Sequence, residues 1–170
     1  SNDGDEVYET LMQEGKDLGL HPGHTSTIRR IEGAMLSYHS DMDINTNPFE
    51  LDLDKFIDLE GSFNFIGKDA LIKIKKSGIK RKQVGLIIEC EKFNGPNTKK
   101  WDIFNGNEKI GHVTSAVYSP RLKQNIALAL VNISCADINK QLKVKIHNNL
   151  VNAVVTEKPF FDPNKLIAKE

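Results

Sequence analysis

The chain has 170 residues with 23 basic and 23 acidic side chains, so its formal net charge is zero. That balance excludes a nucleic-acid binder that works by bulk charge, because such proteins carry a surplus of Lys and Arg. Hydrophobic residues make up 39% of the chain and charged residues 27%, a composition typical of folded globular proteins. No apolar run approaches the roughly 20 residues of a membrane-spanning helix, so we expect no contact with a membrane.

Cysteine and histidine usage argues against disulfide and metal chemistry. Cys90 and Cys135 are too few for a disulfide scaffold and lie in no Cys-x-x-Cys motif. We expect two buried or half-buried thiols in a reducing cytosol, and therefore a cytoplasmic protein. His21 and His24 are separated by a Pro-Gly turn that prevents a helical metal pair, so no metal site is predicted.

The first half of the chain has helical periodicity. Helices are predicted over residues 5–19, from an N-cap at Thr25 or Ser26 as far as Met35, and over residues 66–77. The last of these has lysines near its C-terminal end and a glycine, Gly78, where a cap is expected. Residues 39–54 are polar and rich in turn formers, which predicts an ordered loop along a surface or a cleft.

From residue 81 onward, strand periodicity replaces helical periodicity. Apolar or alternating runs predict strands near residues 84–88, 101–104, 109–113, 126–131, 142–146 and 151–155. Asn105-Gly106 is a hairpin signal between the second and third of them. Short strands joined by polar turns favour a small antiparallel barrel or sandwich. We therefore predict an α+β chain with a domain boundary near residues 80–81.

Generic catalytic motifs are missing from the sequence. It has no P-loop, no G-x-G-x-x-G, no H-E-x-x-H and no G-x-S-x-G. Asp41 and Asp43 could serve as an acid–base pair or could be solvated loop acids. Consecutive residues of a helix point about 100° apart, so only one of Arg29 and Arg30 can share the apolar face. Two interpretations stay open for this pair: an ion pair between Arg29 and Glu32, or an arginine directed at a ligand carboxylate or phosphate.

Two ordered series of residues are similar to the glycine cleavage T-protein (aminomethyltransferase) family. The first includes Ile28-Arg29-Arg30-Ile31-Glu32-Gly33-Ala34, Asp41, Asn47-Pro48-Phe49-Glu50 and Phe65-Ile66-Gly67-Lys68. The second includes residues 81–86, the run Gly111-His112-Val113-Thr114-Ser115, the run Ser119-Pro120-Arg121-Leu122 and an ending with Lys158-Pro159-Phe160 and Asp162-Pro163. Within the family, residues 28–32 and 118–122 most resemble the dimethylsulfoniopropionate demethylase branch.

The resemblance implies the C-terminal half of a tetrahydrofolate-dependent one-carbon transferase. Residues 1–80 would be the helical remainder of the folate-binding domain, and residues 81–170 a small antiparallel β-barrel of Greek-key type. Family members carry their substrate-binding aspartate and pterin-binding glutamate in the other half, so no catalytic residue is assigned here and the chain alone is expected to be inactive. The family has an arginine before residue 28 where Ser26 stands, and a C-terminal tyrosine that Lys165 and Leu166 do not match.

The resemblance also implies the ligands and partners. Ser26, Arg30 and Tyr38 are the expected folate-binding residues, since an aromatic ring suits a pterin and a guanidinium or hydroxyl suits the anionic tail. Tyr38 could equally be a tyrosine at the core edge, and Glu32 a buried partner of an arginine. Expected partners are folate, a small cationic methyl or aminomethyl donor, and the missing N-terminal half or a second copy on an exposed apolar patch. The alternative function is a non-catalytic folate-binding or interaction module.

Overall fold

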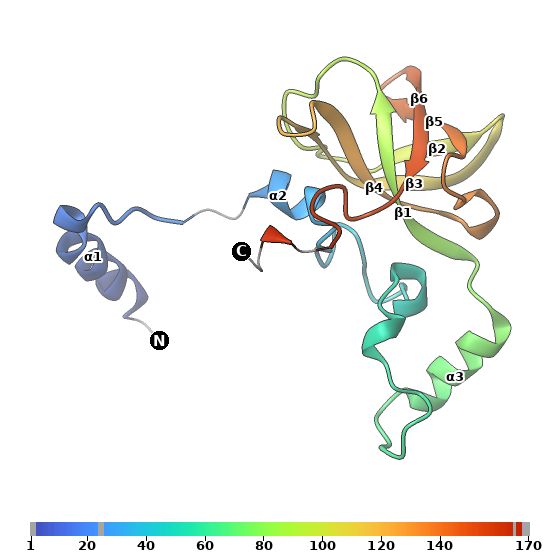
Figure 1. Ribbon diagram of the computed structural model, residues 1–170, viewed down its shortest axis with the longest axis horizontal. Coiled ribbons are helices and arrows are strands. Elements are labelled where there is room, and N and C mark those ends of the chain that lie inside the picture. Colours follow the sequence, from blue (N-terminus) through green and yellow to red (C-terminus); the bar gives the residue numbers. More distant parts are fainter. Residues whose placement is uncertain (1–2, 24–25, 165, 168–170) are drawn as a thin grey trace.

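The computed structural model describes residues 3–23, 26–164 and 166–167 (Figure 1). The helical elements are α1 (Gly4–Glu14), η1 (Lys16–Leu18), α2 (Thr27–Glu32), η2 (Pro48–Leu51), η3 (Asp54–Phe56), α3 (Lys68–Ser77) and η4 (Ile133–Cys135). The strands are β1 (Arg81–Glu89), β2 (Trp101–Asn105), β3 (Glu108–Ser119), β4 (Gln124–Asn132), β5 (Gln141–Ile146) and β6 (Asn149–Thr156). The predicted α+β class is confirmed.

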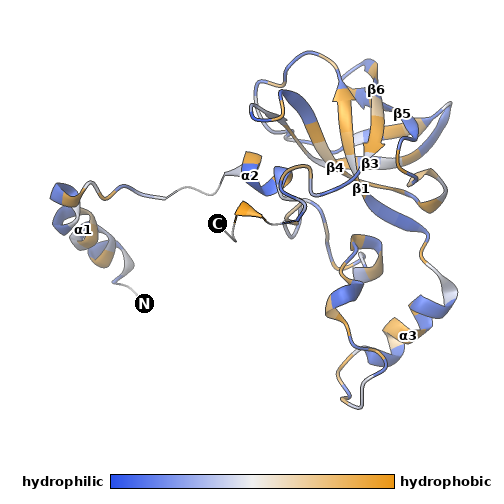
Figure 2. Cartoon of the chain, in the orientation of Figure 1, coloured by the Kyte–Doolittle hydropathy of each residue, from blue (hydrophilic) through white to orange (hydrophobic). Residues whose placement is uncertain are grey.

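The six strands form a closed antiparallel barrel in the order β1-β4-β3-β2-β5-β6. Strands β2, β3 and β4 follow one another as hairpins, and β1 lies beside β4, which is the Greek-key arrangement. Leu86, Ile103, Val113 and Val144 are among the fully buried side chains that fill the interior. Figure 2 shows hydrophobic residues along the upper part of β1 and along β6. The predicted barrel and its hairpin at Asn105-Gly106 are thus confirmed.

One glycine in the barrel is required by close approach of another strand. A Cβ atom on Gly111 would lie 2.1 Å from the carbonyl oxygen of Leu130 on the neighbouring strand. The pairing of β2 with β3 also shifts register beside Gly111, between Ile103 and Phe104. A bulge of this kind increases the local twist that barrel closure needs. The expectation that Gly111 shapes the barrel agrees with this geometry.

The helices differ from prediction mainly at their ends. Residues 5–19 are divided at Gly15 into α1 and η1, and α1 buries none of its residues. Figure 1 shows α1 set apart from the barrel. The second helix ends at Glu32 and not at Met35, because Gly33 caps it and Ala34 has a left-handed backbone with φ of 52°. Helix α3 starts and ends beside Gly67 and Gly78, both at positive φ.

The predicted loop 39–54 is ordered, but it contains η2 and the first residue of η3, and ion pairs hold it against the barrel. Arg81 on β1 donates two hydrogen bonds to Glu50, from Nε at 3.0 Å and from Nη2 at 3.1 Å. Asp52 pairs with Lys82 at 3.1 Å and with Lys158 at 3.0 Å. Burial alone would raise the pKa of Asp52, but the hydrogen bonds and charges of the two lysines lower it overall.

The thiol prediction is only half right. Cys135 is buried as expected, whereas Cys90 is exposed at the end of the first strand, and both are free. Burial of the sulfur nevertheless raises the pKa of the Cys90 thiol. Nowhere in residues 3–23, 26–164 and 166–167 does a helix combine the length and apolar character needed to cross a membrane.

Candidate functional site

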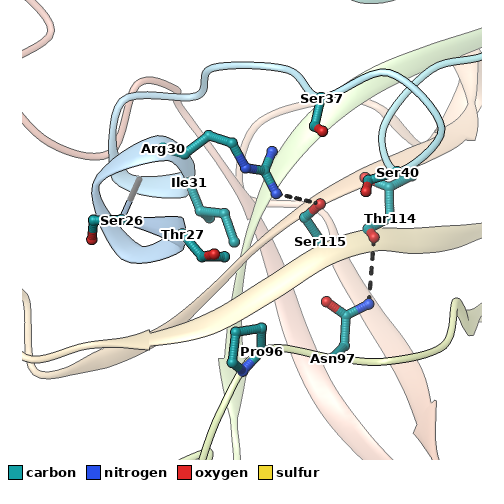
Figure 3. A pocket seen from close by; sticks show the side chains of 10 residues that line it. All are labelled: Ser26, Thr27, Arg30, Ile31, Ser37, Ser40, Pro96, Asn97, Thr114 and Ser115. Carbon is teal, nitrogen blue, oxygen red and sulfur yellow. Dashed lines mark hydrogen bonds between the residues drawn. The ribbon is translucent and has the colours of Figure 1, made fainter. Parts of the chain in front are cut away.

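A polar pocket of about 370 Å³ lies between α2, the loop that follows it and β3 (Figure 3). It is lined by Ser26, Thr27, Arg30, Ile31, Ser37, Ser40, Pro96, Asn97, Thr114 and Ser115. Most of these side chains carry a hydroxyl or an amide, and one carries a positive charge. The pocket therefore offers hydrogen-bond donors and acceptors rather than an apolar surface.

Helix α2 directs Arg30 into this site. Ile31 is fully buried in a cluster with Val117, Ile126 and Leu128 of the barrel, which fixes the rotation of the helix. Because neighbouring helical residues point about 100° apart, Arg30 then faces the side of the cluster and not its centre. Ser26 caps the helix by accepting a hydrogen bond from the backbone N–H of Arg29 at 3.3 Å.

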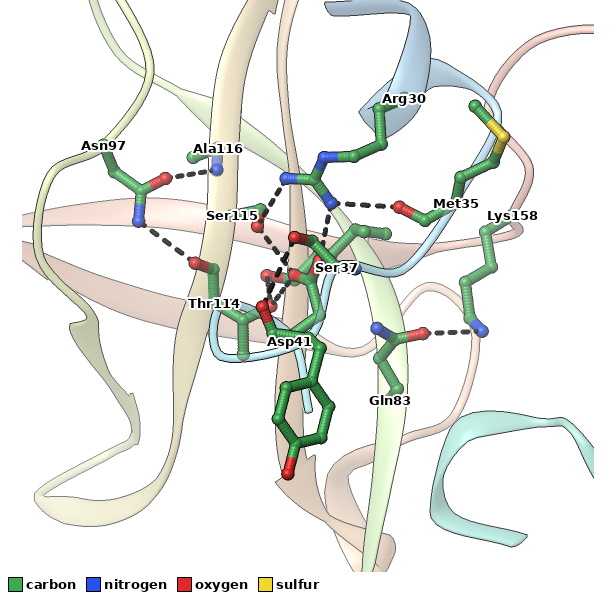
Figure 4. Close-up of polar contacts among 12 residues, drawn as sticks. Arg30, Met35, Ser37, Asp41, Gln83, Asn97, Thr114, Ser115, Ala116 and Lys158 are labelled. Atoms are coloured by element: carbon green, nitrogen blue, oxygen red, sulfur yellow. Dashed lines mark hydrogen bonds and ion pairs between the residues drawn. The ribbon is translucent and has the colours of Figure 1, made fainter. Parts of the chain in front are cut away.

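Asp41 is the centre of the polar network under the pocket (Figure 4). Its side chain is fully buried, and its Oδ2 accepts from Nη1 of Arg30 at 2.6 Å and from the N–H of Ser37 at 3.0 Å. Its Oδ1 lies 2.6 Å from Oγ1 of Thr114 and 2.7 Å from Oγ of Ser115. A buried carboxylate needs such partners, since an unpaired charge in the interior costs several kcal/mol, roughly 3–5 when one partner is removed.

A β-bulge explains how two consecutive residues reach the same carboxylate. In β3, Val113 pairs with Ala129 and Ser115 pairs with Leu128, so Thr114 has no partner in the ladder. In a regular strand Thr114 and Ser115 would point to opposite faces. The extra residue bends the strand and lets both hydroxyls face Asp41.

Arg30 makes further hydrogen bonds in addition to its ion pair with Asp41. Nη1 of Arg30 also donates to the carbonyl oxygen of Met35 at 2.9 Å, and Nη2 donates to Oγ of Ser115 at 2.9 Å. Its side chain keeps an exposed fraction of 21%. The buried carboxylate of Asp41 thus compensates much of the positive charge of Arg30. A ligand in the pocket would meet the remaining N–H donors of the guanidinium rather than an unpaired cation.

Two of the three residues predicted to bind folate lie in one pocket. Ser26 and Arg30 both line it, whereas Tyr38 does not. Tyr38 is 52% exposed and contacts the ring of His39 edge-on at 4.5 Å, so the alternative of a core-edge tyrosine is wrong. The two interpretations of Asp41, half of an acid–base pair with Asp43 or a solvated loop acid, both missed its ion pair with Arg30, and the solvated one is wrong because Asp41 is buried. The spacing of Asp41 from Arg30 in the sequence does not indicate that pair.

Glu32 is buried as expected, but its partner is not an arginine. Its Oε1 accepts a hydrogen bond from Oγ of Ser119 at 2.5 Å, and Ser119 is itself fully buried. Across the described part of the chain, no ion pair joins Arg29, which is exposed, to Glu32, which is buried. The predicted helix pair is therefore wrong.

The pocket can bind but carries little reactive chemistry. Apart from Arg30 its lining side chains are neutral, and the Asp41 carboxylate lies beneath the surface, occupied by four donors. Within residues 3–23, 26–164 and 166–167, no group of three or more His, Cys, Asp and Glu residues could hold a metal ion. This arrangement suits a polar organic ligand positioned for chemistry elsewhere.

Residues 81–162 match the sequence model of the glycine cleavage T-protein C-terminal barrel domain, and residues 1–61 match that of the GCVT N-terminal domain. The chain is similar to the glycine cleavage T-protein family along both of these segments. The six-stranded barrel corresponds closely to the first of these matches, since β1 begins at Arg81 and β6 ends at Thr156.

Curated relatives of the chain are aminomethyltransferases. That of Caldanaerobacter subterraneus subsp. tengcongensis is 37% identical over 161 residues, which cover 93% of this chain and 42% of that protein. That of Bacillus mycoides is 33% identical over 97% of this chain and 45% of the relative. The crystal structure of glycine cleavage system aminomethyltransferase T from Bartonella henselae matches 80% of this chain and 38% of its own, with TM-score 0.73 and 21% identity, which supports the fold. The chain spans less than half the length of the relatives it matches.

Proposed function

We propose that this chain is the C-terminal portion of a tetrahydrofolate-dependent one-carbon transferase. The observation that carries the proposal is the family match over two segments, at an identity of 37% to an aminomethyltransferase of which the chain covers 42%. In the proposed division, residues 1–80 complete the folate-binding domain and residues 81–170 form the barrel domain. A cytoplasmic location fits the two free cysteines.

The residues of the polar pocket fit one end of a folate and not a whole one. Its volume of about 370 Å³ is near the lower limit for sites that enclose drug-sized ligands. Thr27 and Ser40 line it with hydroxyls that bond to no other described residue, and Arg30 adds N–H donors. When bound, tetrahydrofolate would supply the nitrogen that accepts the transferred carbon. Ser26 and Arg30 would hold and orient the ligand, while a role for Tyr38 would need contacts outside this pocket.

Exposed apolar side chains support a covering partner. They include Val7, Tyr8 and Leu11 on α1, and Phe56, Phe63 and Ile66 between η3 and α3, with exposed fractions between 53% and 105%. The chain covers only 42% and 45% of two relatives. The proposed partner that covers these apolar side chains is therefore the missing N-terminal part of a family protein. A second copy of the chain is the alternative occupant.

Folate binding tests the ligand and the residues together. The chain is titrated calorimetrically with 5-methyltetrahydrofolate, alone and mixed with the separately produced remainder of a family protein. We expect binding that strengthens in the mixture and weakens at least about tenfold in Arg30→Ala, since lost charged hydrogen bonds cost about 1.5–3 kcal/mol. Arg29→Ala is the matched control, because Arg29 is exposed and lies outside the pocket. Equal affinities for both variants would contradict the assignment.

Transfer assays test the reaction and the donor. The chain alone is expected to be inactive with tetrahydrofolate, and the mixture active. Comparing a glycine-derived aminomethyl donor, dimethylglycine and dimethylsulfoniopropionate tests the demethylase branch that residues 28–32 favour. Faster turnover of an aminomethyl donor would contradict that branch but not the family-level proposal. Folate binding without transfer from any donor would support the non-catalytic alternative.

A further inference from the structure

A second pocket, of about 540 Å³, opens beside the beginning of β2 and the end of β5. Its lining includes three lysines and one histidine, Lys99, Lys100, Lys145 and His147. All four of these side chains are exposed. The indole of Trp101 forms part of the same wall and is half-buried against the barrel core. None of these residues lines the pocket proposed to bind folate.

The positive charge in this pocket is only partly offset by the protein. Asp102 is the one acidic residue of the lining, and its Oδ1 is already 2.7 Å from Nζ of Lys109. In the described part of the chain, no carboxylate lies within 4.0 Å of the amino groups of Lys99, Lys100 or Lys145. Three lysines on one side of a concave surface concentrate a field that attracts anions.

The charge of Lys100 contributes to the lowered pKa of two nearby groups. Burial, followed by the charge of Lys100, lowers the pKa of His112, which pairs with Asp102 across the β2–β3 ladder. A backbone hydrogen bond from Asn45 is the main cause of the lowered pKa of Asp43, and the charge of Lys100 contributes to it. Both shifts have the sign that a local excess of positive charge produces.

We propose that this pocket binds a small polyanion, a molecule with two or three adjacent phosphate or carboxylate groups. Lysine binds phosphate as a point charge and does not form the two parallel hydrogen bonds that arginine forms. The pocket should therefore select its ligand by the density of negative charge on that ligand. A pocket of this volume suits a small molecule. The zero net charge of the chain argues against a long nucleic acid, which needs an extended basic surface. Trp101 provides a flat apolar surface for any organic part of the ligand.

Fluorescence of Trp101 tests the proposal directly, because it is the only tryptophan of the chain. The 170-residue chain is titrated at constant ionic strength with inorganic tripolyphosphate and, separately, with citrate. We expect a saturable change in emission with at least one of them, and the better ligand distinguishes phosphate from carboxylate. Lys100→Gln and Lys145→Gln should each weaken binding about tenfold, and Lys76→Gln on α3 should not change it.

A second readout separates binding from altered folding. In the wild-type chain, saturating polyanion should raise the pKa of His112, measured by NMR of its ring protons, because a nearby negative charge favours the imidazolium. Unchanged melting temperatures of the three variants exclude loss of structure. The proposal is overturned if neither compound gives saturable binding, if Lys76→Gln weakens binding equally, or if only a single-stranded oligonucleotide binds.

Discussion

The guanidinium of Arg30 and the carboxylate of Asp41 form an ion pair with 2.6 Å between Nη1 and Oδ2. The pair joins α2 to the following loop, and the hydroxyls of Thr114 and Ser115 extend it into the barrel. Asp41 is fully buried on its side chain, whereas Arg30 still reaches the pocket. The pocket wall and the barrel are thereby held in one fixed arrangement.

Asp41→Ala should destabilise the chain by about 3 kcal/mol, because it leaves the half-buried Arg30 without its carboxylate and the Ser115 hydroxyl without its acceptor. The measurement is the free energy of unfolding in urea. Asp137→Ala is the matched control, since Asp137 is exposed and should change stability by no more than about 0.5 kcal/mol. Equal effects of the two substitutions would contradict the role given to Asp41.

Ser119→Ala should cost about 1–3 kcal/mol of stability, because the buried Glu32 carboxylate loses the hydroxyl that donates to it at 2.5 Å. The same hydroxyl accepts from the N–H of Leu122 at 3.0 Å, so two bonds are lost. Chemical denaturation again provides the measurement. The exposed Ser134, changed to Ala, should have almost no effect, and a wild-type stability for Ser119→Ala would refute the buried interaction.

Arg81→Lys should loosen the loop that contains Glu50, although charge is conserved. A lysine cannot make the two parallel hydrogen bonds that Arg81 makes to Glu50, a carboxylate with 5% of its side chain exposed. We expect a loss of about 1 kcal/mol and faster amide hydrogen exchange in residues 45–52. Arg29→Lys, on an exposed arginine, is the control. Unchanged exchange in that loop would speak against the anchor.

His112 should make stability fall as the pH falls below neutrality. Burial and nearby lysines hold its pKa below the ordinary value of 6.5 in the folded chain. The unfolded chain therefore takes up the proton first, so the stability is fully present above the unfolded pKa and is lost as the pH drops. Urea midpoints between about pH 7 and 5 should decline less in His112→Gln than in the wild type.

His21→Gln is the control for the pH experiment, because His21 is exposed. Titration of the salt-bridged Asp52 does not account for a loss of stability in the pH range where His112 titrates. The pKa of Asp52 is lowered from 3.8, so its contribution to stability is lost only in more acidic solution. Parallel pH profiles of the wild type and His112→Gln would contradict the prediction.

Local patterns were enough to predict the strands, the barrel class and the beginning of α2. The alternation Leu142, Val144 and Ile146 and the turn at Asn105-Gly106 depend on neighbours in the chain, so they can be read without a structure. The end of α2 was misplaced because Ala34, an ordinary helix former, adopts a left-handed conformation after Gly33 that its own propensity does not favour.

The sequence by itself determined that only one of Arg29 and Arg30 can share the apolar face with Ile31 and that Ser26 can cap the helix, because both follow from helical geometry. Only the tertiary structure decided what Arg30 bonds to. Its partners Asp41 and Ser115 lie 11 and 85 residues away, and Ser115 reaches the site through a bulge in β3. Contacts between distant segments depend on how the barrel closes, and no local periodicity records that closure.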